Sequence, residues 1–255
     1  MSNFSEDLDE SFDLLIEEAQ RPLQGWDFSY INNRVISAPL TWSYHTEILK
    51  YIRNVDSLLD MGTGGGEFLS LLEPFPEKAF ATEAYEPNFP IAKNRLEPLG
   101  VKVVQIDGDE NLPFEDESFE LIINRHESYS PKEVYRILSK EGIFLTQQVG
   151  GTNDNWLREF LLGDAISEYQ DWNLEFAKNV LEENGFKIVQ KMECFPKKRI
   201  FDIGAIVFYL QAAPWEVPDF TVEKYRDRLF ELHNTISNKG YIEYASHRFL
   251  IKATK

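Results

Sequence analysis

The sequence predicts an α/β protein with a doubly wound, mostly parallel sheet, and two observations support this fold class. Between residues 57 and 148, short apolar runs alternate with segments whose apolar residues recur at helical spacing. Such alternation is typical of parallel strands joined by crossover helices. One of these runs, residues 57–61, passes directly into Gly62, Gly64 and Gly66. A buried strand followed by a glycine turn indicates a ligand site at the carboxyl edge of a parallel sheet.

The elements around that turn are predicted from periodicity and from prolines. Residues 5–20 present apolar side chains along one side of a helix, which Pro22 ends. A second helix is expected over about 41–53, ahead of the first strand. After the glycine turn, residues 67–72 are apolar at helical spacing, which predicts a helix that ends at the proline-containing turn 73–77.

The middle of the chain continues the alternation. A strand at 79–83 precedes a helix over 88–99 that ends at a glycine, and a strand at 101–105 follows. After a polar turn come a strand at 118–124, a helix over 131–138 and a strand at 143–148. The less regular segment near 149–172 is predicted to be a loop–helix insertion.

The last third of the chain predicts further helices and two strands. They are a helix over 174–184, a strand at 186–193, helices over 203–212 and 221–238, and a strand at 247–253. The fold therefore has extra helices at both ends. We expect an N-terminal helical cap over 1–44 and a main domain over 45–255, with lid-like helices near 203–238.

Composition excludes several classes of protein. The 255 residues include 43 acidic and 26 basic ones, and the resulting net charge of −17 repels nucleic acid and anionic membranes. Cys194 is the single cysteine, so neither an intrachain disulfide nor a cysteine-based zinc site is expected, and no other pattern indicates a metal. Residues 1–7 lack the features of a signal peptide, and no apolar run is long enough to span a membrane. We expect a cytoplasmic monomer or homodimer.

The details of the glycine turn decide between kinds of ligand. A dinucleotide fingerprint counted from Gly62 would place its last glycine at position 67, which is Glu67. Counted from Gly64, the last position is Leu69, and no Gly-Lys-Ser/Thr sequence is present for a Walker loop. Asp60, two residues before the first glycine, suits a ligand with an ammonium group and a positive sulfur better than a pyrophosphate.

The segment Leu-Leu-Asp-Met-Gly-Thr-Gly-Gly-Gly, residues 58–66, resembles the first motif of class I S-adenosylmethionine-dependent methyltransferases. The resemblance covers residues 45–148, and it implies a Rossmann-like methyltransferase fold, a seven-stranded sheet whose last strand is antiparallel. It implies S-adenosyl-L-methionine as the cofactor. The residues of this motif expected to hold it are Asp60, Gly62, Thr63, Gly64 and Gly66.

Two acidic positions farther along are further candidates for the cofactor. Glu83 ends the second strand, 23 residues after Asp60, where a carboxylate can take both ribose hydroxyls; Glu86 is the alternative. Residues 106–114 resemble the adenine-binding turn of the family. There the acid for the adenine amino group is Asp107 or Asp109, and Gly108 occupies the most usual position.

Polar residues follow the strand at 118–124, where the acceptor is expected to meet the cofactor. Asn124 at the end of this strand is assigned to the cofactor. If the nucleophile of the acceptor carries a proton, His126 is the predicted base by position, with Glu127 and Tyr129 close behind.

The sequence predicts a methyltransferase that acts on a small-molecule acceptor by direct displacement. Segments 26–29, 124–127 and 247–251 also resemble a group of uncharacterised bacterial methyltransferases with a type-11 methyltransferase domain. Two alternatives remain open. One is an RNA methyltransferase, which the negative charge disfavours; the other is a cofactor-binding protein without catalysis.

Overall fold

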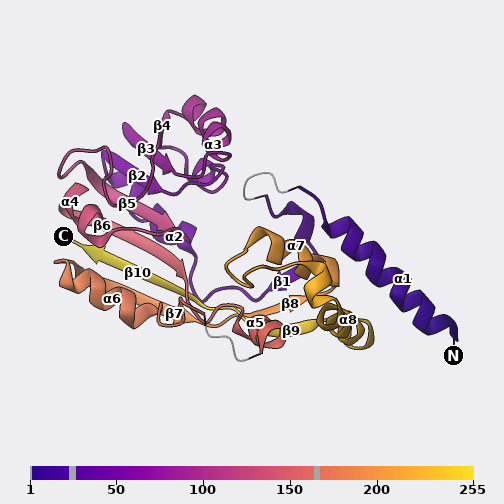
Figure 1. Cartoon of the computed structure of the whole chain (residues 1–255). Coiled ribbons are helices and arrows are strands. Elements are labelled where there is room, and N and C mark those ends of the chain that lie inside the picture. Colours follow the sequence, from indigo (N-terminus) through magenta and orange to yellow (C-terminus); the bar gives the residue numbers. More distant parts are fainter. Residues whose placement is uncertain (1, 23–26, 164–166) are drawn as a thin grey trace. The chain divides into compact units, whose positions relative to one another are not determined.

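The computed structural model of the chain describes residues 2–22, 27–163 and 167–255. Residue 26, which opens the Trp-Asp-Phe-Ser segment, and residues 164–166 of the expected insertion lie outside the described residues. The chain divides into two compact units, whose elements are labelled in Figure 1. Unit 1 comprises Met1–Pro39, Thr152–Gln170 and Phe195–His247, and unit 2 comprises Leu40–Gly151, Asp171–Cys194 and Arg248–Lys255.

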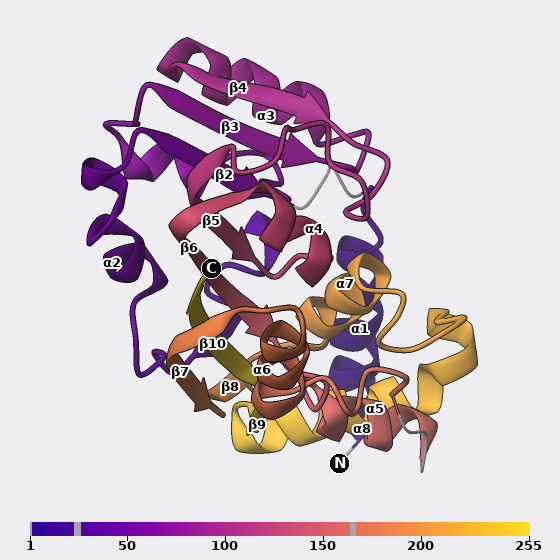
Figure 2. The ribbon, with the colours of Figure 1, turned by 90° about the vertical axis from the view of Figure 1, so that its left-hand side faces the viewer.

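Unit 2 is built on a seven-stranded sheet with the order β4-β3-β2-β5-β6-β10-β7, which Figure 2 shows side by side. The first five strands in this order, β4, β3, β2, β5 and β6, pair in parallel, whereas β10 is antiparallel to both β6 and β7. The predicted fold class and the antiparallel last strand are therefore confirmed. The strands are β2 (Ser57–Met61), β3 (Lys78–Glu83), β4 (Val101–Gln105), β5 (Phe119–Arg125), β6 (Leu138–Val149), β7 (Lys187–Cys194) and β10 (Arg248–Thr254).

Alternate residues of a strand point to opposite faces of the sheet, and helices cover both faces. Leu58 packs in the cluster that contains α2 (Tyr44–Leu49) and α3 (Phe89–Leu96). Its neighbour Leu59 packs in a second cluster with α4 (Pro131–Ile137) and α6 (Leu174–Glu183). The sheet is thus doubly wound, and β2 is buried along its whole length.

Two of the predicted helices in unit 2 are shorter than expected. The segment after the glycine turn forms only a 3-10 turn, η3 (Leu69–Leu72), in place of an α-helix. Proline at 74 leaves too few residues for regular helical hydrogen bonds between the turn and β3. The helix expected over 41–53 is α2 followed by a separate 3-10 turn, η2 (Ile52–Asn54); a third, η4 (Glu97–Leu99), follows α3.

The described residues of unit 1 form four helices and a small sheet that the sequence did not predict. The helices α1 (Ser2–Ala19), α5 (Asn155–Leu162), α7 (Ile203–Ala212) and α8 (Val222–Lys239) share one apolar core. The antiparallel strands β1 (Val35–Ser37), β8 (Lys197–Ile200) and β9 (Ile242–Ala245) lie in that order, and a 3-10 turn, η1 (Ser29–Ile31), precedes them.

In the part of the chain that the structure describes, no helix combines the length and the apolar character needed to cross a membrane. The apolar α7 has ten residues, whereas a span needs about 20. Its side chains instead fill the core of unit 1.

Candidate functional site

The glycine turn follows β2, and its three glycines adopt left-handed backbone conformations. The φ angles of Gly62, Gly64 and Gly66 are +64°, +62° and +80°, a region that other residues rarely adopt. The Thr63 N–H donates a 2.9 Å hydrogen bond to the carbonyl of Thr82 on the neighbouring strand β3. The turn is therefore fixed against the end of β3.

The glycines of this turn differ in what surrounds them. A Cβ on Gly62 would lie 2.2 Å from Cγ of Glu127, and a Cβ on Gly66 would lie 2.8 Å from the Leu96 side chain. A Cβ on Gly64 would have no atom within 4 Å among the described residues. Gly62 and Gly66 are thus required by packing, whereas Gly64 borders open space.

Glu83 ties the end of β3 to the glycine turn. Its Oε2 accepts a 2.6 Å hydrogen bond from the Gly64 N–H, and its Oε1 accepts a 2.8 Å bond from the Tyr85 N–H. The side chain is buried, and this burial raises its pKa, with an additional contribution from the negative charge of Glu127. Glu83, the residue predicted to bind the ribose, therefore lies directly beside Gly64.

Asp60 lies in β2, just before the turn, and is 5% exposed. Burial raises its pKa to about 7, opposed by the Thr63 side chain and by the positive charge of Arg125. Glu83 adds a negative charge that favours the protonated form. Asp60, Glu83 and Glu127 thus concentrate negative charge that a cationic ligand would stabilise.

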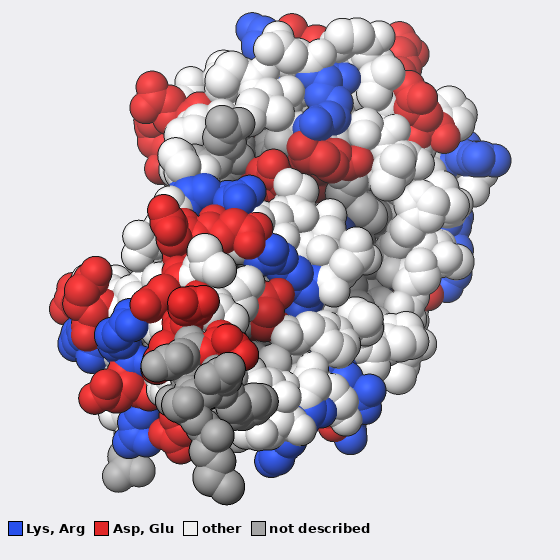
Figure 3. All heavy atoms as spheres, turned by 90° about the vertical axis from the view of Figure 1, so that its right-hand side faces the viewer, with Lys and Arg blue, Asp and Glu red and all other residues white. Residues whose placement is uncertain are grey.

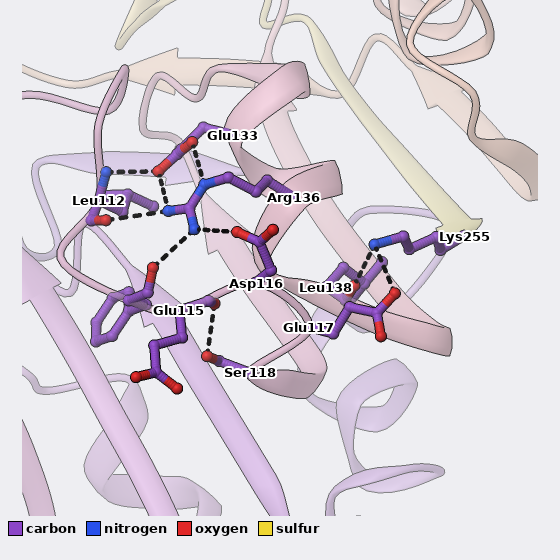
Figure 4. A network of polar contacts seen from close by, with 10 residues as sticks. Leu112, Glu115, Asp116, Glu117, Ser118, Glu133, Arg136, Leu138 and Lys255 are labelled. Atoms are coloured by element: carbon purple, nitrogen blue, oxygen red, sulfur yellow. Dashed lines mark hydrogen bonds and ion pairs between the residues drawn. The ribbon is translucent and has the colours of Figure 1, made fainter.

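The predicted adenine turn is held by one face of α4, as Figure 4 shows. Glu133 Oε1 accepts a 2.7 Å hydrogen bond from the Leu112 N–H. The Arg136 guanidinium donates to the carbonyl oxygens of Leu112 and Phe114, at 3.2 and 2.8 Å, and to the Asp116 carboxylate at 2.8 Å. Arg136 is in turn paired with Glu133. The polar loop is therefore fixed through its backbone.

This arrangement leaves the acidic tip of the loop accessible. Asp107 and Gly108 are exposed and Asp109 is partly exposed. The charge of Asp109 acts on Glu127, whose pKa is raised mainly because the surrounding protein limits its hydration. Asp109 is thus electrostatically linked to the carboxylates at the glycine turn; the choice between Asp107 and Asp109 as adenine ligand stays a prediction.

Asn124 at the end of β5 is fully buried in a hydrogen-bond network. Its Oδ1 accepts from the Thr146 hydroxyl at 2.9 Å and from the Gln148 amide at 2.6 Å. Gln148 also donates to the carbonyl of Glu127 at 3.0 Å. Asn124 therefore holds the segment that carries the catalytic candidates, and its assignment to the cofactor stays a prediction.

The three catalytic candidates lie in different surroundings. His126 has a φ of +62°, and its Nε2 lies 3.0 Å from Nε2 of Gln147. The Glu127 side chain lies against Gly62, and its Oε1 accepts from the Ser128 N–H at 3.1 Å. Tyr129 packs edge-on against Phe144, and burial raises the pKa of its hydroxyl. Glu127 is thus in direct contact with the glycine turn.

Two open hollows of about 620 and 610 Å³ are lined by none of the predicted site residues. Within residues 2–22, 27–163 and 167–255, no group of three or more His, Cys, Asp or Glu side chains could hold a metal ion.

The structure brings Asp60, the glycine turn, Glu83 and Glu127 together at one edge of the sheet. Sequence reasoning gave no role to Arg125, whose guanidinium lies 4.4 Å from the centre of the Phe68 ring beside the turn. It also gave no role to Gln147, which contacts His126, or to Trp42, which contacts Gln147. Position at the end of β5 and β6 was the available signal for Arg125 and Gln147.

Comparison with known proteins agrees with this geometry. Residues 59–146 match a family model described as a methyltransferase domain. The chain is 27% identical over 142 residues to the uncharacterized methyltransferase YcgJ of Bacillus subtilis strain 168, an alignment that covers 49% of this chain and 56% of the relative. It is 27% identical over 114 residues to a protein-L-isoaspartate O-methyltransferase of Chlorobaculum parvum, over 44% and 52% of the two chains. The matched segment thus spans about half the length of these curated relatives.

A solved structure shows the same fold. A Bacillus halodurans C-125 protein with a provisional methyltransferase label superposes with a TM-score of 0.59 at 20% identity, over 83% of this chain and 98% of that one. The part of the chain built around the glycine turn therefore contains a segment that matches a methyltransferase domain, and it shares the fold of this solved structure.

Proposed function

We propose that the protein transfers a methyl group from S-adenosyl-L-methionine to a small-molecule acceptor by direct displacement. The observation that carries this proposal is the open side of Gly64, bordered by the carboxylates of Glu83 and Asp60. A ligand that brings positive charge to this edge relieves the repulsion among the acids, whereas a pyrophosphate would add to it.

The residues present fit this cofactor. Glu83 would hold the ribose, the backbone at Gly64 would lie against the ligand, and the loop carrying Asp107 and Asp109 would hold the adenine. Asp60, Gly62 and Thr63 complete the turn, and Gly66 packs it against α3. When bound, S-adenosyl-L-methionine supplies an electrophilic methyl group on a positively charged sulfur.

The work left to the protein is alignment, exclusion of water and, for a protonated nucleophile, removal of a proton. Glu127 is the best-placed proton acceptor, because its side chain lies against Gly62 and its raised pKa makes it a stronger base than an ordinary glutamate. His126 and Tyr129 remain alternatives for this step.

Surface charge favours a small acceptor over RNA. Among the described residues on the face shown in Figure 3, basic side chains are scattered between acidic ones. RNA binding relies on basic surface that neutralises phosphates, and the chain has a net charge of −17.

The test is calorimetric titration with S-adenosyl-L-methionine and S-adenosylhomocysteine, followed by measurement of S-adenosylhomocysteine release across a panel of small carboxylates, amines and phenols. We expect saturable binding of both compounds and turnover with at least one acceptor class. Absence of binding would refute the proposal. Binding without turnover would favour a non-catalytic role, and salt-sensitive RNA binding would favour the RNA alternative.

A further inference from the structure

A hydrogen-bond chain joins three segments of unit 2 that are far apart in sequence. The Trp42 Nε1–H lies 2.8 Å from Gln147 Oε1, and Gln147 Nε2 lies 3.0 Å from His126 Nε2. Trp42 and Gln147 are buried, whereas His126 is exposed. The backbone N–H of His126 also donates a 2.8 Å bond to the Gln147 carbonyl. His126 is thus held twice by the same residue.

The chemistry of these groups fixes the direction of each bond. An indole N–H can only donate, so the Gln147 atom that faces Trp42 must be the amide oxygen. The Gln147 amide nitrogen therefore faces His126 and donates to its Nε2. A ring nitrogen that accepts carries no hydrogen, which places the hydrogen of the neutral imidazole on Nδ1.

This tautomer changes what His126 can do. The lone pair on Nε2 accepts the hydrogen bond from Gln147. The ring can therefore donate a hydrogen bond to a ligand through Nδ1–H, but it has no free nitrogen to accept one. No described residue accepts a hydrogen bond from Nδ1. The positive φ of His126 costs free energy that the surrounding structure must offset, and such residues cluster at functional sites.

Positive charge surrounds this donor. In the register of the sheet, Arg125 lies opposite Gln147, and Arg248 lies opposite Val149. Residues paired in this way point to the same face of the sheet, and Val149 shares the face of Gln147 because it lies two residues farther along β6. Arg125 and Arg248 therefore both lie on the face of Gln147. Although His126 keeps exposed surface, protein atoms around its ring limit the hydration of the ring and hold the pKa of His126 below its usual value. The charges of Arg248 and Arg125 lower it further.

We propose that the Nδ1–H of His126, beside Arg125, binds a carboxylate group of a ligand. The inference rests on the proposed function, within which two sources supply this chemistry. One is a carboxylate on the methyl acceptor, which would make the acceptor a small organic acid. The other is the methionine end of the cofactor. In either case His126 orients a ligand and leaves proton removal to Glu127.

The first test observes the tautomer directly. Long-range ¹H–¹⁵N spectra of the labelled protein at pH 7 should show a protonated Nδ1 and an unprotonated Nε2 for His126, assigned with His126→Asn. Gln147→Glu should invert this pattern, because a carboxylate accepts from Nε2. A wild-type signal with the hydrogen on Nε2, or a positively charged ring, would overturn the proposal without bearing on cofactor binding.

The second test uses acetate as the probe, with acetamide as the uncharged control. Acetate should shift the His126 ring signals in a saturable manner, and His126→Ala should weaken its binding about tenfold, as expected for loss of a hydrogen bond to a charged group. Equal shifts with acetamide, or no saturation, would contradict the proposal.

Two further titrations separate the sources. If the acceptor supplies the carboxylate, acetate should still bind in the presence of saturating S-adenosylhomocysteine. If the cofactor supplies it, S-adenosylhomocysteine should block acetate, whereas 5′-methylthioadenosine, which lacks the carboxylate, should not. Because acetate is titrated in the free protein first, failure of cofactor binding and failure of this inference give different results.

Discussion

Asp60 in unit 2 and Glu216 in unit 1 are alike in burial and in pKa. They are 5% and 7% exposed, and burial raises the pKa of each carboxyl group to about 7. By these two measures alone, both are candidates for a functional site. Their surroundings separate them.

Glu216 is enclosed by partners from its own unit. Its Oε2 accepts from Arg158 at 3.1 Å, and its Oε1 lies 3.2 Å from the Tyr209 hydroxyl. That hydroxyl also lies 2.6 Å from Asp154, which is paired with Lys198. The hydroxyl has one hydrogen, so a protonated Glu216 that donates to Tyr209 and a Tyr209 that donates to Asp154 satisfy all three groups.

Among the described residues, Asp60 has no such closed network, and it lies beside a turn where Gly64 borders open space. A raised pKa therefore indicates a ligand site only where packing leaves room for the ligand. In unit 1 the charge is balanced within the fold, whereas in unit 2 the acids at the glycine turn leave negative charge for a ligand to balance.

The largest effect is expected where that room is filled. Gly64→Val should abolish measurable binding of S-adenosylhomocysteine in calorimetry, because its side chain would extend into the open space. The positive φ alone should cost at least about 1–2 kcal/mol of stability. Gly100→Val is the matched control in the same unit, since Gly100 has a φ of +87° and a Cβ there would also have no atom within 4 Å among the described residues. Unchanged affinity in Gly64→Val, or equal loss in both variants, would contradict the site.

The closed network should appear in stability and not in binding. The pKa of Glu216 is raised in the folded state, so its contribution to stability is full below pH 4.5 and is lost as the pH rises through about 7. Glu216→Gln should remove this dependence. The difference in unfolding free energy between variant and wild type should shift by roughly 2.5 kcal/mol between pH 5 and 8, in favour of the variant at pH 8.

Urea denaturation at the two pH values measures this shift. Asp227→Asn, which removes an exposed carboxylate in the same unit, should leave the wild-type dependence in place. A parallel change of stability in wild type and Glu216→Gln would show that Glu216 does not titrate in this range.

The two units also differ in how far the sequence predicts them. The alternation from β2 to β6 follows from runs of residues adjacent in the chain, so the strands of unit 2 and the position of Asp60, Glu83 and Glu127 at one edge could be predicted. Strands β1, β8 and β9 have three or four residues each and pair across more than 40 positions, as Val35 does with Ile200. Segments this short carry no periodicity that local reasoning can detect.

The same limit applies within the site. The prediction of a helix after Gly66 is wrong. The apolar residues have helical spacing, but the proline at 74 leaves too few residues for an α-helix before β3. Trp42 and Arg136 act through contacts with distant segments, and their residue types give no signal without the fold. Gln147 also contacts distant segments, and its position near the end of β6 was the signal available for it. Glu83 could be proposed as the ribose ligand because that assignment depends on its place at the end of a strand, which the sequence does reveal.

The smallest effect expected is the pH dependence of cofactor affinity at Asp60. A cationic ligand favours the ionised carboxylate, so the affinity for S-adenosyl-L-methionine should rise as the pH increases from 6 towards 7.5 and Asp60 loses its proton. We expect an increase of up to about tenfold, which corresponds to one unit of pKa displacement. S-adenosylhomocysteine lacks the sulfonium charge and should show a weaker dependence, while Asp60→Asn should show almost none with either ligand. Calorimetric titrations at three pH values measure these slopes; equal slopes for the two ligands in wild type would mean that Asp60 does not sense the charge of the sulfur.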